Sequence, residues 1–90
     1  MSLQVVLYGK PGCCLCDECE TLLRGLQSEF DFTLQKVDIS RDETLHERWK
    51  CHIPVVTFDG RNRVALRITQ ARLRRALLRS QAKQAQAKPS

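Results

Sequence analysis

Residues 9–19 read GKPGCCLCDEC and contain four of the five cysteines in this chain of 90 residues. Their spacing forms two overlapping C-x-x-C pairs, Cys13 with Cys16 and Cys16 with Cys19. In a reducing compartment such a pair is typical of redox chemistry or metal binding, because structural disulfides are rare there. The sequence on either side of this stretch is needed to distinguish the two uses.

Size, cysteine number and the first residues indicate a single cytoplasmic domain. Residues 1–8, MSLQVVLY, have no basic leader and no small-residue cleavage site, so we expect neither a signal peptide nor a membrane span. Five cysteines cannot all pair within one chain, which excludes a complete disulfide framework. A domain of this size buries roughly 60 to 65% of its unfolded surface, enough for a core without disulfides.

The period of the apolar residues predicts four strands and three helices. Short β-branched runs indicate strands, and apolar residues spaced three or four apart indicate helices. The expected strands lie in residues 3–8 (LQVVLY), in residues 32–39 (FTLQKVDI) and on the two sides of the turn Asp59-Gly60 within residues 53–68 (IPVVTFDGRNRVALRI). The expected helices begin near Leu15, after an N-cap at Ser40 or Asp42, and after an N-cap at Thr69.

Two of these helices have a distinct apolar face. On the first helix, of about four turns, the stripe consists of Leu15, Cys19, Leu22, Leu23, Leu26 and Phe30. On the last helix, the shared face consists of Leu73, Ala76, Leu77 and Ser80. Residues 81–90 are polar and too poor in apolar residues to pack. We therefore expect a domain of residues 1–80 and a basic, flexible tail that is either a frayed helix extension or disordered.

The order β-α-β-α-β-β-α predicts an α/β fold. The first two strands and the helix between them form a parallel right-handed unit, and the hairpin completes a mixed four-stranded sheet flanked by three helices. A strand that ends in a Gly/Pro turn, a C-x-x-C pair that opens a helix, and a proline at the start of the third strand form the thioredoxin-type arrangement.

Two segments carry a resemblance to a known family. Residues 8–17, YGKPGCCLCD, and residues 53–60, IPVVTFDG, resemble the glutaredoxin-like branch of the thioredoxin superfamily, in particular the small single-domain family whose active-site turn reads C-x-L-C. The resemblance extends to about Arg79. It implies a thiol-disulfide oxidoreductase with Cys13 as nucleophile and Cys16 as resolving cysteine, a redox disulfide Cys13–Cys16, and no bound cofactor or metal.

Charges near Cys13 favour this role. The start of a helix presents unpaired backbone N–H groups and the positive end of the helix dipole, which stabilise a thiolate. Lys10 adds a nearby positive charge, as a lysine at the matching position does in glutaredoxins. Asp17 and Glu18 in the first turn partly oppose this effect.

The helical wheel separates the four clustered thiols. At about 100° per residue, Cys19 lies at the centre of the apolar stripe, Cys16 lies about 60° to one side, and Cys14 points nearly the opposite way. We therefore predict that Cys13 pairs with Cys16, that Cys19 is a buried structural residue, and that Cys14 is exposed and takes no part. The alternative pair is Cys16 with Cys19.

The resemblance also assigns a substrate site. The family has a cis-proline beside the active-site cysteines, which corresponds here to Pro54. The backbone of the residue before it, here Ile53, pairs with the bound substrate chain in that family. With Lys10, these residues are the expected substrate-binding groups of a monomeric enzyme that acts on protein or low-molecular-weight disulfides.

One departure from ordinary glutaredoxins concerns glutathione. After their fourth strand, a Gly-Gly turn and an acidic residue bind glutathione, whereas here the corresponding stretch reads RITQARL. We expect glutathione to be a poor partner, with a thioredoxin-type reductase or a partner protein as the reductant.

The residues also allow two other functions. Cys13, Cys16, Cys51 and His52 could bind zinc or an iron–sulfur cluster, although adjacent Cys51 and His52 cannot easily reach one tetrahedral ion. Alternatively, a redox-inactive protein could bind polyanions, because residues 61–90 hold nine of the 15 Lys/Arg and none of the ten Asp/Glu. These basic residues are Arg61, Arg63, Arg67, Arg72, Arg74, Arg75, Arg79, Lys83 and Lys88. Since no aromatic residue follows Phe58, we expect no nucleic-acid binding.

Overall fold

The computed structural model describes residues 3–60, 62–65 and 68–87. Its elements are β1 (Leu3–Gly9), α1 (Cys14–Leu26), β2 (Phe32–Asp38), the short 3-10 helix η1 (Ile39–Arg41), α2 (Glu43–Trp49), β3 (Val55–Phe58), β4 (Asn62–Ala65) and α3 (Gln70–Ala87). The predicted order of strands and helices is confirmed. No helix in the described part of the chain is long and apolar enough to cross a membrane.

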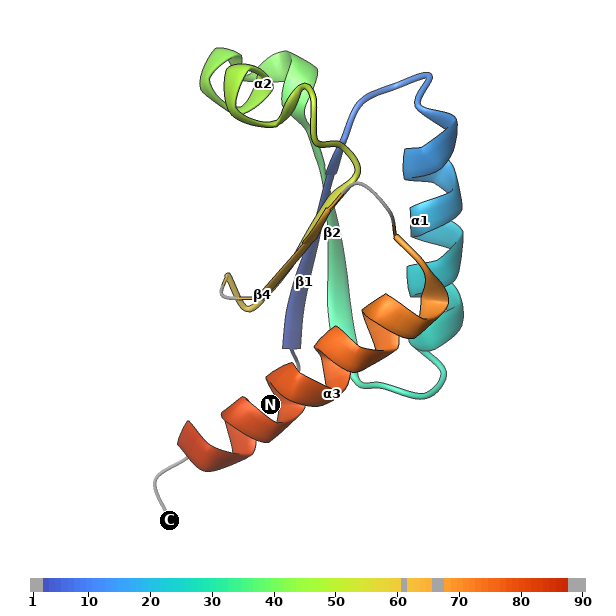
Figure 1. Cartoon of the computed structure of the whole chain (residues 1–90), viewed down its shortest axis with the longest axis vertical. Helices are drawn as coiled ribbons and strands as arrows, with labels where there is room; N and C mark the ends of the chain where they lie inside the picture. Colours follow the sequence, from blue (N-terminus) through green and yellow to red (C-terminus); the bar gives the residue numbers. More distant parts are fainter. Residues whose placement is uncertain (1–2, 61, 66–67, 88–90) are drawn as a thin grey trace.

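The four strands form one mixed sheet in the order β2-β1-β3-β4. β1 is parallel to β2 and antiparallel to β3, and β3 is antiparallel to β4. Helices α1 and α3 lie on one side of the sheet and α2 on the other (Figure 1). The predicted α/β architecture with three flanking helices is therefore confirmed.

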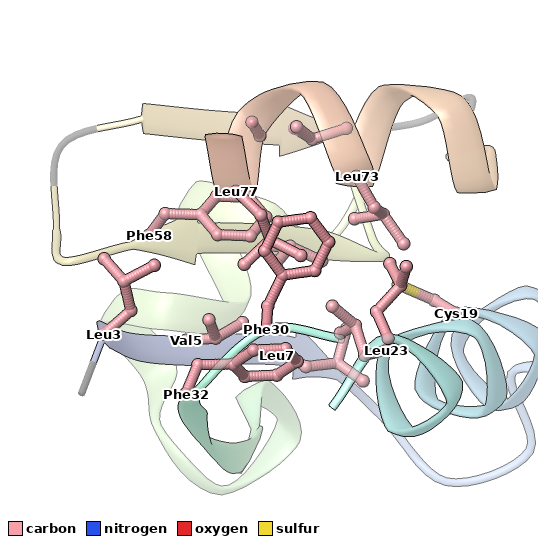
Figure 2. Close-up of a cluster of buried hydrophobic side chains, with 14 residues drawn as sticks. Leu3, Val5, Leu7, Cys19, Leu23, Phe30, Phe32, Phe58, Leu73 and Leu77 are labelled. Atoms are coloured by element: carbon pink, nitrogen blue, oxygen red, sulfur yellow. The ribbon is translucent and has the colours of Figure 1, made fainter. Parts of the chain in front are cut away.

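The main core lies between the sheet and the helices α1 and α3. Alternate residues of β1 are buried there, as expected for a strand with one covered face. Figure 2 shows side chains from the strands and from both helices converging in this layer. The buried set is Leu3, Val5, Leu7, Cys19, Leu23, Leu26, Phe30, Phe32, Val56, Phe58, Val64, Leu73, Ala76 and Leu77. Together with buried Ser80, it confirms the predicted inner face of the last helix.

A smaller cluster covers part of the opposite face. Trp49 of α2 packs with Ile39 and Val55, and Tyr8, Leu45, Ile53 and Ala65 lie around them. The rings of Tyr8 and Trp49 are 6.1 Å apart. This cluster holds α2 against the end of β1 from which the cysteine-rich turn leaves.

The prediction is wrong for one residue of the apolar stripe on α1. Leu15 is 58% exposed, although its spacing put it on the inner face of α1. The buried residues of α1 are Cys16, Cys19, Leu23 and Leu26, so the inner face is centred between Cys16 and Cys19. Leu15 lies at the margin of that face and in the first turn of the helix. Phe30 is buried as expected, but it follows the end of the helix at Leu26.

Helix caps and the hairpin turn follow from local chemistry. Asp42 Oδ1 accepts a hydrogen bond from the Leu45 N–H at 3.1 Å, which selects Asp42 over Ser40 as the cap of α2. Thr69 Oγ1 accepts from the Arg72 N–H at 3.2 Å and caps α3, as predicted. Asp59 and Gly60 have φ of 53° and 71°, which confirms a turn there.

The helix α3 continues to Ala87, past the domain boundary expected at residue 80. Of the two forms expected for the tail, the structure has a helical extension over residues 81–87. Residues 88–90 lie outside the described ranges.

Candidate functional site

Strand pairing brings the cysteine-rich turn beside the segment that precedes β3. Gly9, the last residue of β1, pairs with Asp38 of β2. On the other side of β1, Tyr8 pairs with Val55, the residue that follows Pro54. The end of β1 is therefore flanked by Asp38 and by the Ile53–Pro54 segment.

Cys13 is the N-cap residue of α1. Its backbone is extended, with φ −91° and ψ 105°, and its Sγ accepts a hydrogen bond from the Cys16 N–H at 3.2 Å. Its own N–H donates to the Lys10 carbonyl at 3.4 Å, and Gly12 closes the turn with φ of 82°. Cys13 is half-buried. The predicted position of Cys13 at the helix start is confirmed. Its sulfur accepts a hydrogen bond from a first-turn N–H that has no carbonyl partner within the helix.

Cys16 lies one turn further along α1 and is 6% exposed. Burial raises its pKa to about 12, and the hydrogen bond with Cys13 adds to the rise. Cys16 is therefore a protonated thiol at neutral pH. The two sulfurs of the C-x-x-C pair differ sharply in their access to solvent.

Cys14 and Cys19 occupy the positions that the helical wheel predicted. Cys19 is 1% exposed, and burial raises its pKa to about 12. Its side chain points into the main core (Figure 2). Cys14 is exposed, and so is Cys51. All five thiols are free in this structure.

A pocket of about 370 Å³ opens beside Cys16 rather than beside Cys13. It is lined by Leu7, Gly9, Lys10, Pro11, Cys16, Asp17, Glu20, Lys36, Val37 and Asp38. Part of its wall is charged, and there Lys36 forms an ion pair with Glu20 at 2.9 Å. Sequence reasoning found Lys10 and Asp17 but missed Glu20, Lys36 and Asp38. The parallel pairing of β1 with β2 was the available signal, since it places the end of β2 beside the cysteine turn.

The segment before β3 has the predicted backbone. The Ile53–Pro54 peptide bond is cis, as the resemblance implied, and Pro54 is fully buried while Ile53 is half-buried. The neighbouring His52 is exposed and packs edge-on against Trp49, with ring centroids 6.2 Å apart.

The alternative metal site is not assembled. Over residues 3–60, 62–65 and 68–87, no three His, Cys, Asp or Glu side chains are grouped so that they could hold a metal ion. Cys13, Cys16, Cys51 and His52 are all described, and the fold does not gather them around one point.

Comparison with known proteins agrees with this geometry. A family model described as "Glutaredoxin-like domain (DUF836)" matches residues 4–78. Among solved structures, protein Ne2328 from Nitrosomonas europaea is 25% identical with a TM-score of 0.72, covering 86% of this chain and 93% of that one. Target protein XcR50 from X. campestris is 22% identical with a TM-score of 0.69, covering 79% and 91%.

A mutant thioredoxin from Halobacterium salinarum is also similar in structure. It is 15% identical with a TM-score of 0.71, and the match covers 88% of this chain and 74% of that one. At this identity the likeness shows the fold alone, and it confirms the predicted thioredoxin-like architecture.

Proposed function

The chain belongs to the glutaredoxin-like domain family, and from this premise and the arrangement of Cys13 and Cys16 we propose that it is a thiol-disulfide oxidoreductase. Cys13 is the nucleophile and Cys16 the resolving cysteine. The proposal extends the family assignment to an activity and to named roles.

The hydrogen bond from the Cys16 N–H to Cys13 Sγ is the observation that carries the proposal. A thiolate is the nucleophile in disulfide exchange, and N–H donors at a helix start stabilise negative charge on sulfur. Cys13 has both this donor and partial access to solvent, whereas Cys16 and Cys19 are buried and protonated. Cys13 is thus the member of the cluster best suited to attack first.

The first half of the reaction forms a mixed disulfide. The Cys13 thiolate attacks one sulfur of the substrate disulfide, a Cys13–substrate S–S bond forms, and the substrate S–S bond breaks. The departing substrate thiolate takes up a proton from solvent, and Cys16 gives its own proton to solvent before it attacks in the second half. Once Cys13 is in a disulfide, its charge no longer raises the pKa of Cys16, which leaves burial as the main opposing effect.

The second half releases the reduced substrate. The Cys16 thiolate attacks Cys13 Sγ, forms the Cys13–Cys16 disulfide and expels the second substrate thiolate. Two electrons have then passed from the protein dithiol to the substrate. An external dithiol reductant, such as a thioredoxin-type reductase system, returns the protein to its reduced form.

The proposed substrates are protein or low-molecular-weight disulfides. The Ile53 backbone, two residues before Val55 of β3, is the proposed contact for an extended substrate chain, and Lys10 is the proposed contact for a carboxylate. The protein is proposed to act as a monomer in the cytoplasm, where its thiols stay reduced.

Reduction of a small aromatic disulfide, followed by absorbance and driven by dithiothreitol, tests the activity. We expect the wild-type protein to turn over catalytically and Cys13→Ser to lose the reaction. Cys51→Ser, which removes an exposed thiol outside the pair, is the matched control and should retain activity. A wild-type rate equal to that of the reductant alone would contradict the proposal.

A further inference from the structure

Two arginines from different elements stack on one tryptophan. The guanidinium carbon of Arg48 lies 5.0 Å from the centroid of the Trp49 ring, and that of Arg63 lies 5.1 Å from it. Both are cation–π distances. Arg48 comes from α2 and Arg63 from the edge strand β4. The two side chains of this arginine pair are exposed, whereas Trp49 is only 9% exposed, so the charged groups cover a buried ring.

The strand register places Arg63 on the same side of the sheet as α2. In the pairing of β3 with β4, Val56 is opposite Val64, and both are in the main core. Val55 is opposite Ala65, and both lie in or around the smaller cluster under α2. Because side chains alternate along a strand, Arg63 points to the same side as Ala65. It therefore faces α2 and not α3.

The N–H donors of the arginine pair remain available. A guanidinium that stacks on a ring keeps its in-plane N–H groups for other acceptors. In residues 3–60, 62–65 and 68–87, neither Arg48 nor Arg63 forms an ion pair. Glu47, the acidic residue next to Arg48 on α2, instead pairs with Lys50 at 3.3 Å. Trp49 thus holds both guanidinium groups in place while they keep their capacity to bind a carboxylate.

His52 connects the arginine pair with the thiol site. Its ring packs edge-on against Trp49, with centroids 6.2 Å apart, and it directly precedes Ile53, the proposed backbone contact for substrate. Since both guanidinium carbons lie within 5.1 Å of the same Trp49 centroid, neither is more than about 11 Å from the His52 ring. An extended chain covers that distance in roughly three residues, at about 3.3 Å per residue. A substrate segment that pairs with Ile53 can therefore also reach the arginine pair.

We propose that Arg48 and Arg63 form an acid-binding site that selects substrate proteins with an aspartate or glutamate a few residues from the attacked disulfide. The inference rests on the proposed oxidoreductase function and assigns it a substrate class, extended acidic protein segments. Guanidinium forks bind carboxylates through two parallel hydrogen bonds. Because the stack on Trp49 already restricts both side chains, binding costs them less conformational freedom than it would cost an unrestrained surface arginine.

Competition between peptide disulfides for Cys13 tests the inference. The probes are disulfide-linked dimers of a short cysteine peptide with one glutamate, or a glutamine in the same place, at successive positions up to about four residues from the cysteine. They are equilibrated with the full chain carrying Cys16→Ser, and mass spectrometry after peptide mapping measures the adducts on Cys13. At one or more positions the glutamate peptide should be preferred about tenfold, the effect of one hydrogen bond to a charged group.

Variants in the same Cys16→Ser background separate the arginine pair from general charge. Arg48→Gln and Arg63→Gln should each abolish most of the preference for glutamate. Arg75→Gln is the matched control, because it removes the same charge from an exposed position on α3, across the sheet from α2, and it should keep the preference. This control also accounts for the effect of glutamate on the reactivity of the peptide thiol, which is the same in every variant. Fluorescence of Trp49, the only tryptophan in the chain, should change more with the glutamate adduct than with the glutamine adduct.

Three results would overturn the inference. One is equal binding of glutamate and glutamine peptides at every position, in a chain whose circular dichroism shows that it is folded. Another is an equal loss of preference in Arg63→Gln and Arg75→Gln, which would indicate attraction to total charge. The third is an unchanged preference in both Arg48→Gln and Arg63→Gln, which would mean that the arginines only pack on the ring.

The equilibrium on Cys13 also separates this inference from the proposed function, because adduct formation needs no turnover. A glutamate preference that depends on the arginine pair, in a protein that does not catalyse reduction of a neutral disulfide, would support the acid-binding site and contradict the oxidoreductase activity. Catalytic turnover without any glutamate preference would support the activity and contradict the acid-binding site.

Discussion

The Sγ atom of Cys16 lies 2.8 Å from the position that a Cβ atom on Gly9 would occupy, and the Cys16 Cβ lies 3.1 Å from it. No side-chain atom would normally approach so closely. The last residue of β1 therefore has to be glycine for α1 to set its buried thiol against the end of the strand.

Replacement of this glycine should disturb both stability and the thiol pair. Gly9→Ala forces the Cys16 side chain to move, and overpacking of this kind costs about 1–3 kcal/mol of unfolding free energy. Gly25→Ala is the control, because a Cβ there meets nothing within 4 Å and an alanine suits a helix. That control should gain about 0.4–1 kcal/mol. Urea denaturation of the reduced proteins measures both, and equal midpoints would contradict the packing argument.

Removal of the resolving cysteine should trap the reaction halfway. In Cys16→Ser the Cys13 thiolate still attacks a disulfide, but no neighbouring thiol displaces the product, so a covalent adduct through Cys13 should accumulate. Cys13→Ser should form no adduct. Non-reducing mass spectrometry after a disulfide challenge measures both results.

The control for this trap is Cys14→Ser. Cys14 is exposed on the outer side of α1, so its loss should change little. An adduct or internal disulfide found mainly on Cys16 and Cys19 would mean that CDEC, and not CCLC, is the active pair.

Cys19 should matter for stability and not for chemistry. It is 1% exposed within the main core, so Cys19→Ser places a hydroxyl in an apolar layer at a cost of about 1–3 kcal/mol. The rate of disulfide reduction per folded molecule should stay close to wild type. Chemical denaturation and the same disulfide assay separate the two effects, and a lost activity in the folded variant would contradict this division.

Stability should fall in alkaline solution. The pKa values of Cys16 and Cys19 are raised from 9.0 to about 12 in the folded chain. Above pH 9 the unfolded chain releases these protons while the folded chain keeps them, so the folded state loses about 1.4 kcal/mol per pH unit for each thiol until pH approaches 12. Below pH 9 these thiols cause no change. Urea denaturation between pH 8 and pH 10.5 should show a steeper fall for wild type than for Cys19→Ser, and equal slopes would contradict it.

Glutathione should be a poor reductant. The Gly-Gly turn and acidic residue of ordinary glutaredoxins are replaced by RITQARL, where Thr69 instead caps α3 through its hydroxyl. Lys10 supplies a single point charge for a carboxylate. The protein should therefore turn over more slowly in an assay with a glutathione mixed disulfide than in a disulfide assay coupled to thioredoxin reductase. The opposite ranking would show that another surface binds glutathione.

Much of the fold could be predicted because its signals are local. The β-branched apolar run of β1, the three-four spacing in α3, the caps at Asp42 and Thr69 and the turn at Asp59 each depend on features within a few residues. The same applies to the outward position of Cys14 and the inward position of Cys19, which follow from the period of one helix. These features need no knowledge of the other elements.

Only the tertiary structure decided how those elements meet. The exposure of Leu15 depends on the angle at which α1 packs on the sheet, and the contact between Cys16 and Gly9 depends on how closely α1 approaches β1. The sequence by itself determined the strands, the helices and the C-x-x-C spacing at the start of α1, because each is encoded in neighbouring residues. The charged wall beside Cys16 and the ion pair between Arg74 and Glu29 required packing between segments distant in the chain, whose geometry no local pattern specifies.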